Sequence, residues 1–199
     1  LQQNKVTKVI RKHLIKKSLD MLGTLSEDEE QYKTFYDNFG KTIKLGIHED
    51  QSNREKLSKL LRFTSANNGD KLVSLSQYVE SMKEGQKGIY YITGESISSV
   101  ETSPFVEKVR SRGYDVLYMT YPMDEYCMNQ MKDFEEKPLV CITKEGLDLG
   151  EDEETKKALE KRTEELKPLC ERIKEILGEV VEKVVVSPRL ETSPCVLVT

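Results

Sequence analysis

IYYITGES (residues 89–96) is the stretch of sequence that decides the fold. Its first five residues are apolar, aromatic or β-branched without a charged break, which is typical of a parallel strand buried on both faces. Two similar runs follow at Val116–Thr120 and Leu139–Thr143, and helical patterns at about 98–112 and 123–131 separate the three runs. Strands that alternate with helices in this way predict a parallel sheet with right-handed crossovers.

The preceding residues, 1–62, look all-helical. Helices are expected over Lys5–Leu22 and from Ser26, where Ser26-x-x-Glu29 reads as a capping box and Gly40 as a terminator. A second capping box, Ser52-x-x-Glu55, predicts a third helix. The apolar residues expected to face a core are Val6, Val9, Ile10, Leu14 and Leu22 in the first helix, and Leu57, Leu60 and Leu61 in the third.

After residue 145 the pattern changes again. A long helix is expected to run to Leu177, with Pro168 kinking or interrupting it. Strands are expected at Val180–Val186 and from Cys195 to Thr199. The predicted fold class is therefore α/β, in three parts: a helical connector (1–62), a small three-layer α/β/α domain with a short parallel sheet (63–145), and the helix-plus-strands start of a further domain (146–199). Thr64–Asp70 reads as a polar linker at the first of these boundaries.

Composition narrows the function classes. The formal net charge of −4 gives no global basic character, so neither nucleic acid nor an anionic membrane is expected as a partner. The four cysteines form no Cys-x-x-Cys pair, which favours reduced, buried thiols in an intracellular protein. No apolar run is long enough to span a bilayer. Because the chain opens on Leu1 rather than methionine, we expect a piece of a longer protein.

Two polar clusters are candidate sites. His48, Glu49 and Asp50, followed by Asn53 and Arg54, could form an acid–base pair or part of a metal site. The chain has only two histidines, so a structural role is favoured, with Asp50 and Asn53 bracing a turn and Arg54 pairing with a carboxylate.

The second cluster is the turn Thr93–Ser96, which lies where a doubly wound sheet binds phosphate. It has one glycine rather than three, and no lysine follows at P-loop spacing. Ser96 as a helix N-cap is the favoured interpretation. A small phosphate- or nucleotide-binding enzyme that uses this turn is the alternative function.

Two surfaces are weaker candidates. A basic face of the first helix could meet phosphates, an acidic partner or membrane, or could simply be solvated; it comprises Lys8, Arg11, Lys12, Lys16 and Lys17. A Met- and Tyr-rich stretch, Tyr121–Met131, could be an adaptable binding surface, although packing against the sheet is favoured. Cysteine catalysis is unsupported, because no candidate base accompanies any cysteine in sequence.

Several blocks resemble the ninety-kilodalton heat-shock chaperone family, in order and over essentially the whole chain. They are LQQNKVTKVIRKHLIKK, LGIHEDQSNREKLSKLLRF, IYYITGES, FVEKVRSRGYDVLYMT, DEYCMNQMKDF and VEKVVVSPRLETSPCVLVT. The cytosolic eukaryotic branch is the most similar. Thr7 and His13 depart from the usual pattern, and so does the variable segment 150–154.

The resemblance implies a position and a function. The chain would hold the later middle domain and the start of the C-terminal domain of a cytoplasmic, ATP-dependent chaperone that matures clients such as kinases and receptors with co-chaperones. ATP and Mg²⁺ would bind in an N-terminal domain of the same protein, and the intact protein would form a homodimer through helices that this piece lacks. Gln2 would contact the γ-phosphate, and the family's arginine would lie three residues before Leu1. The piece alone would have no catalytic residue, no metal site, no bound cofactor and no ATPase activity.

Overall fold

The computed structural model describes residues 5–144, 147, 153–187, 190 and 192–197. The helices are α1 (Lys5–Leu25), α2 (Glu29–Glu49), α3 (Arg54–Ser58), α4 (Leu75–Ser81), α5 (Ile97–Glu101), α6 (Pro104–Ser111), α7 (Pro122–Met131), α8 (Glu153–Leu177) and the 3-10 helix η1 (Gly178–Val180). The strands are β1 (Phe63–Ser65), β2 (Gly69–Val73), β3 (Ile89–Thr93), β4 (Leu117–Met119), β5 (Asp133–Phe134) and β6 (Lys137–Cys141).

A six-stranded mixed sheet forms the centre of the molecule, in the order β2-β1-β4-β3-β6-β5. Its three middle strands are parallel as predicted, with Tyr91 of β3 opposite Leu117 of β4 and Cys141 of β6. The edges are antiparallel, so the prediction of a purely parallel sheet is wrong there. The predicted linker at Thr64–Asp70 is also wrong, because these residues belong to the β1–β2 hairpin. Its outer strand is short and largely exposed, so it lacks the apolar run that marks a buried strand.

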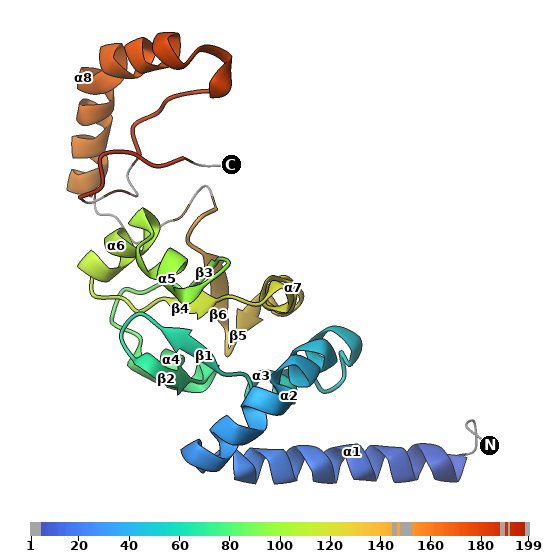
Figure 1. Cartoon of the computed structure of the whole chain (residues 1–199). Coiled ribbons are helices and arrows are strands. Elements are labelled where there is room, and N and C mark those ends of the chain that lie inside the picture. Colours follow the sequence, from blue (N-terminus) through green and yellow to red (C-terminus); the bar gives the residue numbers. More distant parts are fainter. Residues whose placement is uncertain (1–4, 145–146, 148–152, 188–189, 191, 198–199) are drawn as a thin grey trace.

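Helices cover both faces of this sheet (Figure 1). Alternate residues of β3 feed two cores, with Ile89 and Tyr91 on one face and Tyr90 and Ile92 on the other. The first core also takes residues of α2, α4 and α7, and the second takes residues of α5 and α6. The predicted three-layer α/β/α arrangement is confirmed.

The helix α2 is longer than predicted. It begins after Asp28, whose carboxylate accepts a hydrogen bond from the Gln31 amide, so the predicted Ser26 cap is wrong. The helix also runs through Gly40 to Glu49. A Cβ at Gly40 would lie 3.0 Å from Tyr36 Cε1, so this glycine permits close packing of the tyrosine ring within the helix rather than ending it.

The helix α1 projects away from the sheet (Figure 1). None of its residues is buried, and Val6, Val9, Ile10 and Leu14 are each more than half exposed. Their predicted burial is therefore wrong. Leu22 does pack against the first core, as predicted, because the end of α1 meets α2.

Prolines shape the remaining helices. Pro104 starts α6, so the predicted helix at 98–112 is two helices, α5 and α6. Pro168 lies inside α8, which bends along its length (Figure 1). Residues 181–187 and 195–197 form no strand, so both strands predicted there are wrong over the described residues. A β-branched run alone does not make a strand, since a strand needs a neighbour for its hydrogen bonds. The proposed boundaries near residues 62 and 145 stay predictions.

Candidate functional site

The junction of α2 with α7 holds a buried ion pair. Lys44 Nζ lies 2.5 Å from Asp124 Oδ1, and the two residues are 3% and 1% exposed. Sequence reasoning missed this pair. The spacing on α2 could have indicated a buried lysine, because Lys44 follows Tyr36 and Gly40 at four-residue steps on the face that buries Ile47.

Other groups around the pair complete the junction. The Lys44 ammonium lies 4.7 Å from the centre of the Tyr121 ring and 5.2 Å from that of Phe63, which are favourable cation–π distances. The Tyr121 backbone amide donates to Asp124 Oδ2 over 3.1 Å. The Cys127 thiol donates to the Lys44 carbonyl over 3.3 Å. Burial, reinforced by nearby Asp124, raises the pKa of Cys127 to about 11. The thiol is therefore protonated near neutral pH and is no nucleophile.

The cluster at His48–Arg54 braces the same junction. Asp50 caps the end of α2, and its carboxylate accepts bonds from the Asn53 amide at 3.2 Å and from Asn53 Nδ2 at 2.7 Å. The predicted bracing of this turn is confirmed. The α3 N-cap is Asn53, without a side-chain cap bond, so the predicted Ser52–Glu55 box is wrong. His48 and Glu49 are exposed.

Arg54 does not pair with a carboxylate, and that prediction is wrong. Its Nε donates to the Ile47 carbonyl over 2.9 Å, and its Nη1 donates to the Gln130 carbonyl over 3.1 Å. Arg54 thus joins the end of α2 to the end of α7. Carbonyls at helix C-termini attract cations, so the guanidinium satisfies two groups that the helices leave unpaired.

The polar groups of the turn at Thr93–Ser96 form hydrogen bonds within the protein. Ser96 caps α5 as predicted, with its hydroxyl accepting from the Ser99 amide over 3.2 Å. The Gly94 amide donates to the Met119 carbonyl over 3.1 Å. A Cβ at Gly94 would lie 2.3 Å from Val100 Cγ1, which explains the glycine by packing. Because these amides are engaged within the fold, they do not form a phosphate cradle.

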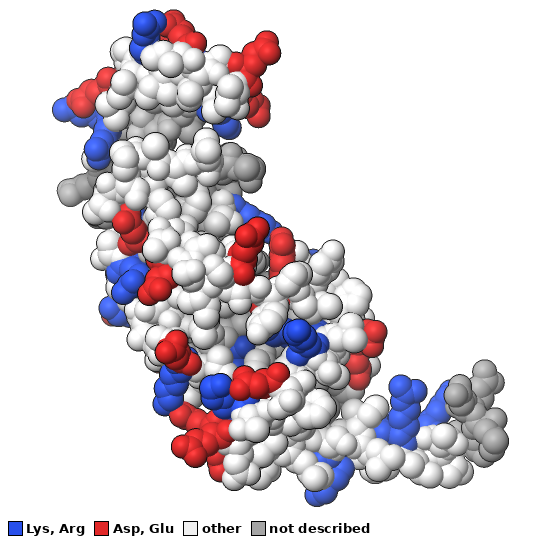
Figure 2. Space-filling view, viewed as in Figure 1, with Lys and Arg blue, Asp and Glu red and all other residues white. Residues whose placement is uncertain are grey.

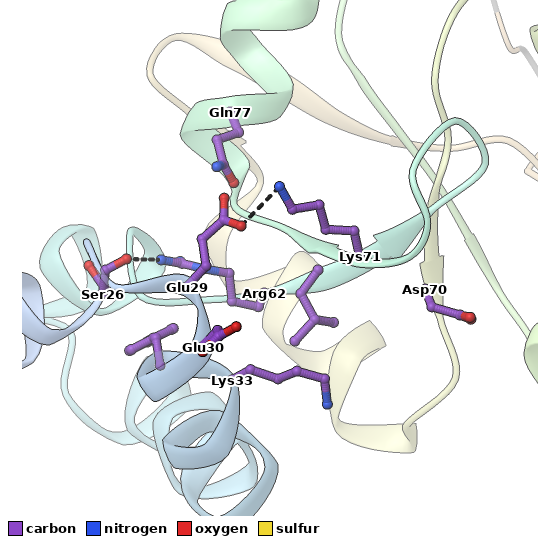
Figure 3. Close-up of a pocket in the computed structure, with 10 residues that line it drawn as sticks. Ser26, Glu29, Glu30, Lys33, Arg62, Asp70, Lys71 and Gln77 are labelled. Carbon is purple, nitrogen blue, oxygen red and sulfur yellow. Dashed lines mark hydrogen bonds and ion pairs between the residues drawn. The ribbon is translucent and has the colours of Figure 1, made fainter.

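A pocket of about 180 Å³ lies between the start of α2, Arg62 and β2 (Figure 3). The Arg62 guanidinium lies 4.4 Å from the Tyr32 ring centre and donates to the Ser26 carbonyl over 3.3 Å. Burial lowers the pKa of Arg62. Lys71 pairs with Glu29 at 2.9 Å across the opening. The charges in this pocket largely neutralise one another, so it presents no strong field to an ionic ligand.

The outer surface carries the remaining candidates. Lys8, Arg11, Lys12, Lys16 and Lys17 are exposed on α1, and Figure 2 shows Lys and Arg side chains along this projecting helix. In the Tyr- and Met-rich stretch, Met128 and Met131 pack in the first core as predicted, whereas Tyr121 and Tyr126 are more than half exposed.

The cysteines match their prediction in part. All four are free, and Cys127 and Cys141 are buried, but Cys195 is exposed. Among the described residues, no group of three or more His, Cys, Asp or Glu side chains could hold a metal ion. Within that same part of the chain, no helix has the length and apolarity that a membrane span requires. Gln2 lies outside the described residues.

Comparison with known proteins relates this chain to one protein family. The family model described as Hsp90 protein matches residues 1–199. The whole chain aligns with heat shock protein 83 of Leishmania donovani at 54% identity and with the endoplasmin homolog of Caenorhabditis elegans at 48%. It spans 44% and 26% of the lengths of these two relatives.

A solved structure agrees with the sequence matches. The middle domain of a Plasmodium falciparum heat shock protein superimposes with a TM-score of 0.67 at 36% identity, over 71% of this chain and 60% of that one. Over the part of the chain that superimposes, the fold is thus that of an Hsp90 middle domain. The chain belongs to the Hsp90 family of heat-shock chaperones.

Proposed function

We propose that this chain belongs to an ATP-dependent chaperone. Within that chaperone it connects a helical part to a small α/β domain while clients and co-chaperones bind. The family model over all 199 residues and the 54% identity to heat shock protein 83 support this proposal. The intact protein would be a homodimeric ATPase that matures client proteins. Its ATP and Mg²⁺ would lie in a domain outside this chain.

The Lys44–Asp124 pair is the observation that carries the linking role. It joins α2 to α7 in a buried setting, and Arg54 joins the ends of the same two helices. A joint made by buried, directional contacts resists rotation and sliding, since either motion would separate the charges. A displacement of α2 during an ATPase cycle would therefore move the α/β domain with it.

A matched set of variants in the intact protein tests this role. Asp124→Asn removes one charge of the joint, and we expect client maturation to fall more than ATP binding. Asp37→Asn removes a charge from the exposed Lys33–Asp37 pair of the same helix and should change neither. Equal client maturation in the two variants would contradict the linking role.

The contribution to ATP hydrolysis is proposed for Gln2, from the family resemblance. An amide donor aimed at the γ-phosphate would stabilise the charge that develops during phosphoryl transfer. In the intact protein, Gln2→Ala should slow hydrolysis and leave nucleotide affinity nearly unchanged. The purified 199-residue chain should show no ATP turnover. Robust turnover by this chain, or a large loss of ATP affinity in the variant, would argue against the assignment.

The remaining points are the cellular compartment and the alternative function as a phosphate-binding enzyme. We propose the cytoplasm, because identity is higher to heat shock protein 83 than to the endoplasmin homolog. The engaged amides at Gly94 and Ser99 speak against a phosphate-binding enzyme built on Thr93–Ser96. Nucleotide titration with amide shifts observed at Glu95 and Ser96 would detect such a site.

A further inference from the structure

A carboxylate on α6 holds a segment that follows it by more than eighty residues. Glu107 Oε1 accepts a hydrogen bond from the Thr192 hydroxyl over 2.8 Å, and its Oε2 accepts one from the Ser193 hydroxyl over 3.2 Å. These hydroxyls, Thr192 foremost, lower the pKa of Glu107. Val196 packs against the second core nearby. Together these contacts attach residues 192–197 to the α/β domain.

The attached segment is a suitable kinase substrate. Residues 192–197 have no helix or strand, Ser193 is half-buried, and Thr192, Pro194 and Cys195 are exposed. Protein kinases bind their substrates as extended peptides, and one class selects a serine that proline follows. Ser193-Pro194 is such a dipeptide in a segment that already lacks regular structure.

Ser103-Pro104 is the informative comparison. Ser103 is the N-cap of α6, and Pro104 is the first residue of that helix. Phe105 and Val106 directly behind them are buried in the second core. A kinase could bind this dipeptide as an extended peptide only after α6 had unfolded. A third dipeptide, Ser187-Pro188, continues into residues outside the described ones.

We propose that Ser193 is a phosphorylation site for a proline-directed protein kinase, and that its phosphorylation releases residues 192–197 from α6. In the reaction the Ser193 oxygen attacks the γ-phosphorus of ATP bound to the kinase. The new O–P bond forms as the bond to the β,γ-bridging oxygen breaks, ADP leaves, and the hydroxyl proton passes to a base of the kinase.

The release follows from the change in charge and in hydrogen bonding. The Ser193 hydroxyl donates to Glu107, whereas a phosphoserine oxygen has no proton to donate near neutral pH and adds close to two negative charges. The phosphate would stand against a carboxylate that Thr192 also keeps ionised. Like charges at this distance repel, so the segment separates from α6 and Val196 loses its place on the core.

The experiment uses the full-length protein, ATP and a purified proline-directed kinase. Mass spectrometry should find phosphate on Ser193 and none there in Ser193→Ala. Hydrogen exchange of the backbone amides in residues 192–197, of which Pro194 has none, should then be about tenfold faster than before phosphorylation, as expected for loss of hydrogen bonds to a charged group. Glu107→Gln is the matched control, because it keeps the shape and removes the charge. Phosphorylation should accelerate exchange much less in this variant.

Three results would overturn the proposal. The first is phosphate on Ser103 or Ser187 with none on Ser193. The second is phosphate on Ser193 with unchanged exchange at 192–197. The third is slower exchange there, which would mean that cations on α6 such as Lys108 or Arg110 capture the phosphate and tighten the segment.

Discussion

Lys44 of α2 and Asp124 of α7 form an ion pair of 2.5 Å in which both side chains are almost completely buried. Moving two charges out of water costs several kcal/mol each, and their attraction offsets this cost only in good geometry. The backbone amide of Tyr121 and the Tyr121 and Phe63 rings supply further favourable contacts. Loss of one partner therefore leaves the other buried without compensation.

We expect Asp124→Asn to lower the free energy of unfolding by about 3–5 kcal/mol, measured by urea denaturation. Asp37→Asn, in the exposed Lys33–Asp37 pair at 2.9 Å, should cost less than about 1 kcal/mol. The double variant Lys44→Met/Asp124→Leu removes both charges and keeps apolar volume, so it should recover most of the stability lost in Asp124→Asn. Similar losses for Asp124→Asn and Asp37→Asn would show that the buried pair is not specially coupled.

Two buried tyrosines offer a second comparison. The Tyr78 hydroxyl donates to the Asp115 carbonyl over 2.6 Å and accepts from the Tyr90 amide over 3.1 Å. Tyr78→Phe would remove both of these hydrogen bonds from buried groups, so we expect a loss of about 2–3 kcal/mol in the free energy of unfolding.

The control is Tyr118→Phe. Tyr118 is 5% exposed, and within the described part of the chain its hydroxyl has no hydrogen-bond partner. Removal of this hydroxyl should change stability by less than about 0.5 kcal/mol or should increase it. Denaturation curves that rank Tyr118→Phe as the more damaging change would be inconsistent with the hydrogen bonding described here.

The parts of the fold that were predictable are those that local sequence controls. Continuous apolar runs indicate the three parallel strands, and the helix cap at Ser96 forms where the short-range pattern predicts it. Gly94 similarly marks a tight turn. The resemblance of the quoted blocks identified the family, which spacing and composition alone could not do.

The parts that were missed depend on distant partners. Lys44 meets Asp124 eighty positions later, and Arg54 meets Gln130 at a similar separation. The exposed strand β2 exists because β1 lies beside it, although its own residues are mostly polar. Gly40 is explained by the Tyr36 ring and not by its position in a pattern. In each case the decisive interaction is tertiary, so local periodicity carries little information about it.

Two glycines should respond to alanine in opposite directions. A Cβ at Gly94 would lie 2.3 Å from Val100 Cγ1, and Val100 is buried in the second core. Gly94→Ala must therefore displace packed atoms, at a cost of about 1–3 kcal/mol. Gly23 lies in α1, and a Cβ there would meet nothing within 4 Å. Gly23→Ala should stabilise the helix by about 0.5–1 kcal/mol. Thermal unfolding of the two variants and the parent measures whether each substitution raises or lowers the unfolding temperature. Changes in the same direction would count against the packing assigned to Gly94.

The buried thiol at the α2–α7 junction should make stability fall in alkali. Burial raises the pKa of Cys127 from 9.0 to about 11, so above pH 9 the unfolded chain loses this proton while the folded chain keeps it. The contribution of the protonated thiol to the free energy of unfolding is fully present below pH 9 and is lost as pH rises toward 11. At pH 10 the free energy of unfolding has fallen by about 1.4 kcal/mol. Tyr32, whose pKa burial raises from 10.0 to about 12, adds a second decline at higher pH.

Urea denaturation between about pH 8 and pH 10 tests this dependence. The quantity to compare between variants is the change in the free energy of unfolding with pH, not its value at one pH. Cys127→Ala should lower stability at every pH, since it opens space in the first core, but it should flatten the decline that begins near pH 9. Cys195→Ala is the matched control, because this cysteine is exposed, and its variant should follow the parent profile. If Cys127→Ala and the parent lose stability in parallel up to pH 10, the alkaline decline originates elsewhere and not in the buried Cys127 thiol.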